Sequence, residues 1–388
     1  MHVLVLPSFY PDKSDNNLGS FFKEQVKTIS NSYVEINVVY LQQKSLRRLS
    51  LKTLKNNYFQ STLNVEKSWL EYLSKGWKLP TIFGDKIWIY LTEKLVEKYI
   101  KKHGKPDLIH VHNLYLAGIV ANKIKKKYKV PFVITEHSSV FLRKGFLTKR
   151  NLKIASEVFN NASKLIVVSE SLKKSISKIL PVIKIEILPN MVDTSFFKPL
   201  KKANNRNYIN FISVGNLDKN KNHSLLIDAF FKLSKTIQNI DLKICGEGPE
   251  KQNLQDKIVN LKIDNKIKLM GFQNRKQLLE MYRNSDCLVH TSNYETFGVV
   301  IIEALSCGLP FISTRSGGPE DIYEKPFGFL VDCNNAAMLK QSMMKFINEK
   351  DDFSKEIIRN KTISIYSHQV FLKEILKIYN EALKVKVL

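Results

Sequence analysis

Residues 199–215 read Pro-Leu-Lys-Lys-Ala-Asn-Asn-Arg-Asn-Tyr-Ile-Asn-Phe-Ile-Ser-Val-Gly. The first part, 199–207, is polar and has no apolar periodicity, which is typical of a linker. The second part, 208–215, is rich in β-branched and aromatic residues and ends in glycine, which is typical of a strand. Because a new strand begins directly after a polar stretch near the middle of the chain, we expect the two sides to fold as separate domains.

On both sides of the linker, strand-like runs alternate with helix-like runs, as in parallel sheets covered by helices. The strands expected before the linker are 2–7, 35–40, 107–112, 131–137, 165–169 and 184–189, with helices at 19–30, 86–102, 114–128, 151–161 and 170–178. The strands expected after it are 208–215, 242–246, 266–270, 287–291 and 310–314, with helices at 222–237, 250–262, 274–284, 298–307 and 334–348.

The fold class that follows is α/β, with two doubly wound, Rossmann-like domains over residues 1–198 and 208–364. The last segment, 365–388, is an amphipathic helix outside the alternation, and we expect it to pack back toward the first domain. Ligands of doubly wound sheets bind at the carboxyl ends of the strands. With two such domains facing each other, the predicted site is the cleft between them.

Length and composition agree with a globular protein of two or three domains, since 388 residues contain 44% hydrophobic and 25% charged residues. The four cysteines form no Cys-x-x-Cys pair, so we expect reduced thiols and no zinc site. The first residues, MHVLVLPSFYP, indicate a strand and not a signal peptide, and no apolar run is long enough to span a bilayer. These features predict a cytoplasmic protein.

The formal net charge of +25 is concentrated in the first half of the chain. Residues 1–200 carry 33 Lys and Arg against 15 Asp and Glu, whereas residues 201–388 carry 28 against 21. A basic half attracts nucleic acid, anionic membrane or phosphorylated substrate, although a lysine-rich composition of the source genome is an equally simple reason. Residues 41–60 are basic, contain no acid and have leucines near helical spacing, so they predict a helix on an anionic membrane surface or one that packs its leucines inward.

Residues 295–303, Glu-Thr-Phe-Gly-Val-Val-Ile-Ile-Glu, place two carboxylates around the expected start of a helix. Glu295 would lie in the loop and Glu303 about two turns inside the helix. The first turn of a helix offers free N–H groups and a partial positive charge to a phosphate. A sugar nucleotide presents hydroxyls, a diphosphate and further hydroxyls in this order, so the stretch predicts a sugar-nucleotide site. An ordinary surface helix with two glutamates is the alternative.

The wider pattern resembles family 4 glycosyltransferases, which are retaining enzymes of the GT-B type. The residues that carry the resemblance lie mainly within 208–332 and are Gly271-Phe-Gln273, Tyr282, Ser285-Asp286, the two glutamates with seven residues between them, Ala304, Gly308-Leu-Pro310, Gly317-Gly318 and Gly328. The resemblance implies that Glu295 contacts the donor sugar and Glu303 the ribose hydroxyls. It also implies that the backbone amides of Phe297, Gly298 and Val299 meet the sugar and phosphate.

Further positions follow from the same resemblance. Lys221 matches the family's diphosphate-binding lysine, whereas Asn216 stands where an arginine is usual, and Lys219 is a candidate for the missing charge. Gly19 matches the glycine of the first loop, where the absence of a Cβ lets backbone approach the diphosphate. His137 matches the histidine that lines the cleft near the reacting sugar. The expected catalytic residues are therefore Glu295, His137 and Lys221. His110 and His112 share one face of a strand and are expected near the acceptor.

The chemistry expected is transfer of a hexose from a UDP- or GDP-sugar, as co-substrate, to a glycan or lipid-linked acceptor in cell-surface polysaccharide or glycolipid synthesis. The sequence has no Asp-x-Asp motif, so we expect no metal cofactor, and Lys221 and the helix dipole would stabilise the leaving diphosphate. Another sugar-nucleotide enzyme, such as a 2-epimerase, and an inactive carbohydrate-binding relative are alternatives. A basic nucleic-acid-binding protein is a further one, but no known nucleic-acid module is recognisable.

Overall fold

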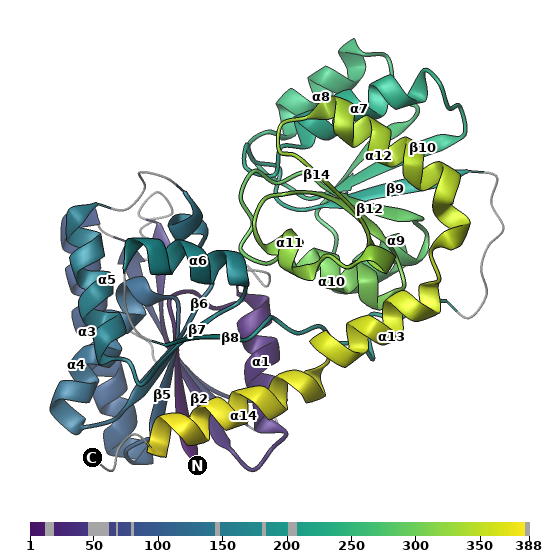
Figure 1. Cartoon of the computed structure of the whole chain (residues 1–388). Helices are drawn as coiled ribbons and strands as arrows, with labels where there is room; N and C mark the ends of the chain where they lie inside the picture. Colours follow the sequence, from purple (N-terminus) through teal and green to yellow (C-terminus); the bar gives the residue numbers. More distant parts are fainter. Residues whose placement is uncertain are drawn as a thin grey trace. The chain divides into compact units, whose positions relative to one another are not determined.

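The computed structural model describes residues 1–11, 19–45, 62–66, 69–78, 81–143, 148–180, 184–200 and 208–384. They form two compact units, drawn in Figure 1. The first consists of Met1–Val168, Lys173–Leu188 and Leu372–Leu388, and the second of Ser169–Leu172 and Pro189–Phe371. Residues 189–198 thus belong to the second unit, whereas the sequence placed them in the first domain. The linker residues 201–207 lie outside the described residues.

The first unit contains an eight-stranded sheet in the order β3-β4-β2-β1-β5-β6-β7-β8. The strands are β1 (His2–Pro7), β2 (Glu35–Ser45), β3 (Thr62–Glu66), β4 (Trp69–Lys78), β5 (Leu108–His112), β6 (Phe132–Glu136), β7 (Lys164–Val167) and β8 (Ile185–Ile187). All neighbours are parallel except β3, which runs antiparallel to β4 at the edge of the sheet. The strand order reverses between β1 and β5, so this unit has a topological switch point there.

The helices associated with this sheet are α1 (Ser20–Ser30), α3 (Thr81–His103), the π-helical turn η2 (Leu114–Gly118), α4 (Ile119–Tyr128), the short turn η3 (Ser139–Leu142), α5 (Lys149–Asn161), α6 (Glu170–Ile179) and the C-terminal α14 (His368–Lys384). Helices α3, α4 and α5 lie side by side along one face of the sheet (Figure 1). Helices α1 and α14 meet the other face, where Phe22 of α1 contacts His112 and Tyr379 of α14 contacts His110.

The second unit has a six-stranded, fully parallel sheet in the order β11-β10-β9-β12-β13-β14. Its strands are β9 (Ile209–Val214), β10 (Ile240–Cys245), β11 (Ile267–Gly271), β12 (Cys287–His290), β13 (Phe311–Thr314) and β14 (Gly328–Val331). Its helices are α7 (His223–Ser234), α8 (Lys251–Asn260), α9 (Arg275–Arg283), α10 (Val299–Ser306), α11 (Gly318–Ile322), α12 (Ala336–Glu349) and α13 (Lys355–Tyr366), with short turns η4 (Lys325–Phe327) and η5 (Lys350–Asp352). The switch point lies between β9 and β12.

A continuous apolar core explains why this unit folds as one layer of strands between helices. Buried residues of β9, β10 and β12 pack against α7, α8 and α12, and Phe211 makes edge contacts with Phe230 and Phe346. The helices α7, α8 and α12 lie on one side of the sheet in Figure 1, and α9, α10 and α11 lie on the other.

The doubly wound α/β fold class predicted from the sequence is confirmed, but one predicted element is wrong. Residues 41–45 belong to strand β2 and not to a helix, because they pair in parallel with β4 and Leu41 is 2% exposed. The remainder of the predicted basic helix, 46–60, lies outside the described residues. Strands β3, β4 and β14 and helices α11 and α13 were not predicted. No helix among the described residues has the length and apolar character to cross a membrane.

Candidate active site

Two loops of the second unit meet at its switch point. One follows β9 and leads through Lys221 into α7, whose first turn is capped by the Asn222 side chain, which accepts from the Leu225 N–H. The other follows β12, runs through Glu295 and leads into α10. Because β9 and β12 are neighbours in the sheet, both loops start at adjacent carboxyl ends, where ligands of this fold class bind.

The two loops are joined by a charged contact between Lys221 and Glu295. The Lys221 Nζ donates to Glu295 Oε2 at 2.5 Å, and His290 Nε2 lies 3.2 Å from the same oxygen. Ser292 Oγ lies 2.9 Å from His290 Nε2. Because an ionised carboxylate only accepts hydrogen bonds, the proton of the neutral His290 ring lies on Nε2. Both bonds go to Oε2, and none of the described residues donates a hydrogen bond to Oε1 of Glu295.

Burial and charge act in opposite directions on Glu295. Burial alone would raise the pKa of this carboxyl group, but the Lys221 ammonium and the hydrogen bonds from His290 and Lys221 hold it well below its usual range. Burial lowers the pKa of His290, and the neighbouring Glu295 only partly opposes this. At neutral pH the cluster therefore contains an ionised Glu295, a charged Lys221 and a neutral His290.

Backbone contacts hold the Glu295 loop in place. Glu295 N–H donates to the Ser316 carbonyl at 2.9 Å, and Gly318 N–H donates to the Glu295 carbonyl at 2.7 Å. The Lys221 loop is tied to the same segment, because Asn220 Nδ2 donates to the Tyr294 carbonyl at 3.0 Å. The position of Glu295 relative to Lys221 is therefore fixed by the backbone as well as by their ion pair.

The predicted phosphate-binding segment forms the start of α10. Gly298 is the residue before the helix and has φ +104°, a left-handed conformation that favours glycine. The Phe297 ring is buried and meets Tyr366 edge to face at 5.8 Å. Gly318 lies directly against this segment, since a Cβ there would lie 2.3 Å from Phe297 Cα. The N–H groups of Val299 and Val300 have no partner within the helix, whereas the Ile301 N–H donates to the Gly298 carbonyl at 2.9 Å.

Glu303 lies inside α10 and is held by a tyrosine from α9. The Tyr282 hydroxyl donates to Glu303 Oε2 at 3.0 Å, and Tyr282 is 1% exposed. Burial, and then the Glu303 charge, raise the pKa of Tyr282 well above its usual value, so it remains a donor at neutral pH. Tyr282 thus fixes the orientation of the carboxylate that the sequence assigned to ribose hydroxyls.

The turn after β9, which begins at Gly215, contacts both the backbone and the side chain of Lys221. The Lys221 N–H donates to Asp218 Oδ1 at 3.0 Å, and the Lys221 side chain runs past Gly215, where a Cβ would be 3.4 Å from its methylenes. Asn216 and Lys219 are exposed in this turn. The Lys219 carbonyl accepts from Asn293 Nδ2 at 3.2 Å, so its backbone is part of the contact between the two loops.

In the first unit, Gly19 and His137 lie at the carboxyl edge of the sheet and share a neighbour. Gly19 precedes α1 and has φ +75°, and a Cβ there would lie 3.0 Å from the Phe22 ring. The Phe22 ring stacks on His112 at 4.5 Å and meets His137 at 5.1 Å. His112 Nδ1 lies 3.3 Å from His137 Nε2, whereas the buried His137 Nδ1 has no hydrogen-bond partner. Burial lowers the pKa of His137 to about 3, so this ring is neutral.

The remaining polar groups under this edge have structural partners. His110 bonds with the Tyr379 hydroxyl and with Thr135 Oγ1, both at 2.7 Å, and so joins α14 to the sheet. Glu136 accepts from the backbone N–H groups of Leu114, His137 and Ser138 at 2.7–3.0 Å. Burial raises the pKa of Glu136 to about 7, although these three bonds oppose the shift. Both ring nitrogens of His110 are therefore bonded within the first unit.

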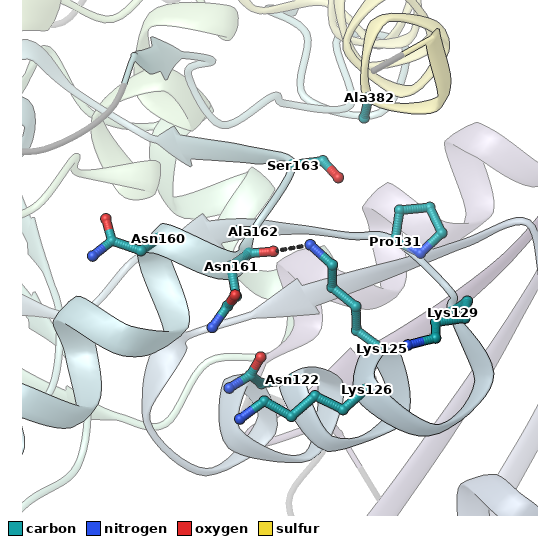
Figure 2. A pocket seen from close by; sticks show the side chains of 10 residues that line it. All are labelled: Asn122, Lys125, Lys126, Lys129, Pro131, Asn160, Asn161, Ala162, Ser163 and Ala382. Atoms are coloured by element: carbon teal, nitrogen blue, oxygen red, sulfur yellow. Dashed lines mark hydrogen bonds between the residues drawn. The ribbon is translucent and has the colours of Figure 1, made fainter. Parts of the chain in front are cut away.

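A cavity of about 510 Å³ in the first unit is a less suitable ligand site. Figure 2 shows Lys125, Lys126 and Lys129 around it, with Asn122 and Asn161. It lies at the amino ends of β6 and β7, the edge opposite to Gly19 and His137. Helices α4 and α5 both end here, so their carbonyl ends face the cavity, and Lys125 Nζ donates to the Asn161 carbonyl at 2.7 Å. The lysines thus neutralise two helix ends.

The structure therefore brings together Lys221, Glu295 and the start of α10 in one unit, and Gly19 and His137 in the other. Sequence reasoning missed His290 and Ser292. His290 is the last residue of β12, and the rule that strand ends carry the site could have singled it out.

Comparisons with known proteins identify the family of the chain. Residues 194–363 match the family described as "Glycosyl transferases group 1", and residues 70–196 match "Glycosyltransferase Family 4". A curated relative, the GPI3 subunit of phosphatidylinositol N-acetylglucosaminyltransferase from Saccharomyces cerevisiae, is 25% identical over 247 residues. The match covers 61% of this chain and 52% of the relative, so the chain spans about half the length of this relative.

Two solved structures have the same fold over nearly the whole chain. Sucrose-phosphate synthase from Thermosynechococcus elongatus aligns with a TM-score of 0.80 at 14% identity, over 99% of this chain and 100% of that one. HepE from Anabaena, in complex with UDP, aligns with a TM-score of 0.73 at 18% identity, over 98% and 100%. These likenesses and the two doubly wound sheets show that the chain has the GT-B fold. The two family matches, which together span residues 70–363, assign the chain to glycosyltransferase family 4.

Proposed function

We propose that the protein is a retaining, metal-independent glycosyltransferase that moves a hexose from a nucleoside-diphosphate sugar to a glycan or lipid-linked acceptor. The observation that carries this proposal is the contact of Lys221 with Glu295 beside the start of α10. At the switch point, the Lys221 ammonium would bind the diphosphate and the Glu295 carboxylate would accept from sugar hydroxyls. Glu303 lies farther along, in α10.

Each part of the proposed donor is assigned to residues of the second unit. The diphosphate would lie between Lys221 and the first N–H groups of α10, where the helix dipole favours negative charge. The Oε1 atom of Glu295, which receives no bond from the described residues, would accept from a sugar hydroxyl. Glu303, oriented by Tyr282, would accept from the ribose hydroxyls. The complex of HepE with UDP supports a uridine nucleotide as the first donor class to test.

In the proposed reaction the bond between the anomeric carbon and the diphosphate oxygen breaks. The acceptor oxygen forms its bond to the same face of that carbon, and its proton passes to the leaving phosphate. Lys221 and the α10 dipole would stabilise the charge that grows on this phosphate. No carboxylate is assigned as a covalent nucleophile. His137, whose neutral ring has a buried and unpartnered Nδ1, would position the sugar or the acceptor.

The acceptor is proposed to be a membrane-associated glycan carrier in cell-surface polysaccharide or glycolipid synthesis. The support is the excess of basic residues in the first half of the chain. The proposed donor residues Lys221, Glu295 and Glu303 lie in the other half. A relative named for an activity on phosphatidylinositol agrees with a lipid-linked acceptor. Binding to nucleic acid is not part of the proposal.

Melting shifts with a panel of UDP-, GDP- and ADP-sugars test the donor class. One nucleotide should raise the melting temperature, and Glu303→Ala should remove most of that shift. Release of nucleoside diphosphate should continue in EDTA. If no nucleotide shifts the transition, the sugar-nucleotide site is wrong. If EDTA stops turnover, the metal-independent reaction is wrong.

A further inference from the structure

Helix α3 of the first unit carries apolar side chains on its solvent face as well as on its buried face. Trp88, Leu95 and Tyr99 face the sheet and are at most 8% exposed. On the opposite side, Phe83 is 68% exposed and Tyr90 is 56% exposed. A surface helix normally shows a polar outer face, so the first turns of α3 depart from the pattern.

The exposed apolar residues form one stripe. Phe83, Ile87 and Tyr90 follow each other at spacings of four and three residues, which places them on one face of a helix. Tyr115 of η2 is 42% exposed, and its hydroxyl lies 3.3 Å from Asp85, which is on a different side of α3 from the stripe. Scattered exposed apolar residues are normal on proteins, but a contiguous group indicates an interaction site.

Lysines continue the stripe along the same face. Lys94, Lys98 and Lys101 follow Tyr90 at helical spacing, and Lys86 lies beside Phe83 and Ile87. The Lys94 ammonium lies 5.8 Å from the centre of the Tyr90 ring. Among the described residues, no ion pair is formed by Lys86, Lys98 or Lys101.

The acids of α3 cancel only part of this positive charge, since Glu97 pairs with Lys94 but none of the described acids pairs with Lys86, Lys98 or Lys101. Asp85 accepts from Tyr115, and Glu93 pairs with Lys123 of α4 at 2.7 Å. Glu97 is 8% exposed and pairs with Lys94 at 3.0 Å and with Lys127. The outer face of α3 is thus aromatic and apolar in its first turns and basic beyond them, which complements a surface with an apolar interior and anionic headgroups.

The stripe lies at the edge of the sheet where an acceptor would be expected. Strand β4 runs parallel to β2, as β5 and β6 do to β1, so β4 ends at the carboxyl edge that holds His112 and His137. Helix α3 begins shortly after β4, at Thr81, and the bond between Tyr115 and Asp85 fixes its first turns next to the segment that follows β5. An acceptor carried in a bilayer at this stripe would therefore be close to the edge with His137.

We infer that the stripe formed by Phe83, Ile87 and Tyr90 docks on an anionic lipid bilayer and brings the first unit to its acceptor. This inference rests on the proposed function, since it names the surface on which the lipid-linked acceptor is met. Aromatic side chains enter the interface, and lysines remain at the headgroups. The stripe differs from the basic stretch 46–60, which lies outside the described residues.

Flotation of the full chain with vesicles tests the inference. The probes are vesicles of phosphatidylcholine alone and of phosphatidylcholine with phosphatidylglycerol. Wild type should bind the anionic vesicles, and binding should fall as salt increases. Phe83→Ser with Tyr90→Ser should lower the partition coefficient roughly tenfold or more, since two apolar side chains no longer leave water. Charge reversal at Lys86, Lys98 and Lys101 should remove the preference for anionic vesicles.

Matched controls keep the outcome clear. Tyr33, 67% exposed in the turn before β2, lies at the opposite edge of the sheet, and Phe272 is 53% exposed in the second unit, so Tyr33→Ser and Phe272→Ser should leave flotation unchanged. Equal loss in the controls, or no loss in the stripe variant, overturns the inference. So does a stripe variant that changes the oligomeric state instead, because the occupant is then a second copy.

The melting shift with the nucleotide sugar tests the proposed function separately, and the stripe variant should retain this shift. A lost melting shift with intact flotation would contradict the donor site and leave the docking surface standing. Loss of flotation only on charge reversal of Arg47, Arg48 and Lys52 would assign membrane contact to that stretch and overturn the role of α3.

Discussion

Replacing Lys221 by Met tests the cluster at the switch point of the second unit. The side chains of Lys221 and Glu295 are 21% and 15% exposed, so the pair is largely shielded from water. The substitution keeps the length of the side chain but removes the charge and one charge-assisted hydrogen bond, which contributes ~1.5–3 kcal/mol. We expect a loss of about 2 kcal/mol in the free energy of unfolding, which lowers the melting temperature by roughly 4–8 °C in a domain of this size.

The pH dependence makes the test sharper. In the wild type the pKa of Glu295 is held low, so its contribution to stability is present above the ordinary pKa of a carboxyl group and is lost as the pH falls. In Lys221→Met, burial acts without the ammonium and raises that pKa. Glu295 then retains a proton in the folded state, so the loss of stability should be larger at pH 8 than at pH 5.

The assay is urea unfolding followed by circular dichroism and by tryptophan fluorescence. All three tryptophans, Trp69, Trp77 and Trp88, belong to the first unit, so fluorescence reports that unit and serves as an internal control. The double variant Lys221→Met with Glu295→Gln should lose less stability than the sum of the two single variants. Additive losses, or a loss that does not depend on pH, would refute the reasoning.

Three further predictions follow from other contacts. Glu303→Ala should weaken binding of the nucleoside diphosphate by ~1–3 kcal/mol in calorimetry. Tyr282→Phe should weaken it by a smaller ~0.5–1.5 kcal/mol, because it removes the hydroxyl that donates to Glu303 and to the Val300 carbonyl but leaves the carboxylate in place. Affinities equal to that of the wild type would remove both residues from the site. Gly318→Ala should destabilise the fold by ~1–3 kcal/mol in thermal unfolding, since its Cβ would overlap the Phe297 backbone, and an unchanged melting temperature would contradict this packing. The free energy of unfolding should fall as the pH drops below 6.5, because only the unfolded chain takes up a proton at each buried histidine whose folded pKa is lowered. The fall should be up to ~1.4 kcal/mol per pH unit for each such histidine. A flat profile between pH 6.5 and pH 4.5 would contradict the burial of these histidines in the neutral form. These histidines are His110, His112, His137, His223 and His290.

The parts of the fold that were predictable are those whose signal is local. Strands such as β1 and β9 are runs of mostly buried apolar residues, and the start of α10 is marked by Gly298. Strand β4 was missed because Trp69–Lys78 contains lysines and a glycine and gains its strand conformation from pairing with β2. Helix α11 was missed because it has only five residues.

The predicted helix over 41–60 shows the limit of periodicity. Leucines at helical spacing suggested a helix, but Leu41 continues a buried strand whose partner, β4, lies about thirty residues later in the chain. The contact of His290 with Glu295 has a similar origin. The end of β12 could have marked His290 itself, but its contact with Glu295 depends on the pairing of Glu295 with Gly317, a distant segment that the residues around His290 do not indicate.

The most direct test of the donor site is a crystal structure with the nucleoside diphosphate that gives the largest melting shift. We expect the diphosphate within hydrogen-bonding distance of Lys221 Nζ and of the first N–H groups of α10, and the ribose hydroxyls on Glu303. The Lys221 to Glu295 bond should lengthen as the ammonium turns to the phosphate. A nucleotide bound elsewhere, such as in the lysine-lined cavity at the amino edge of the first unit, with the Lys221 and Glu295 pair unchanged, would contradict the account.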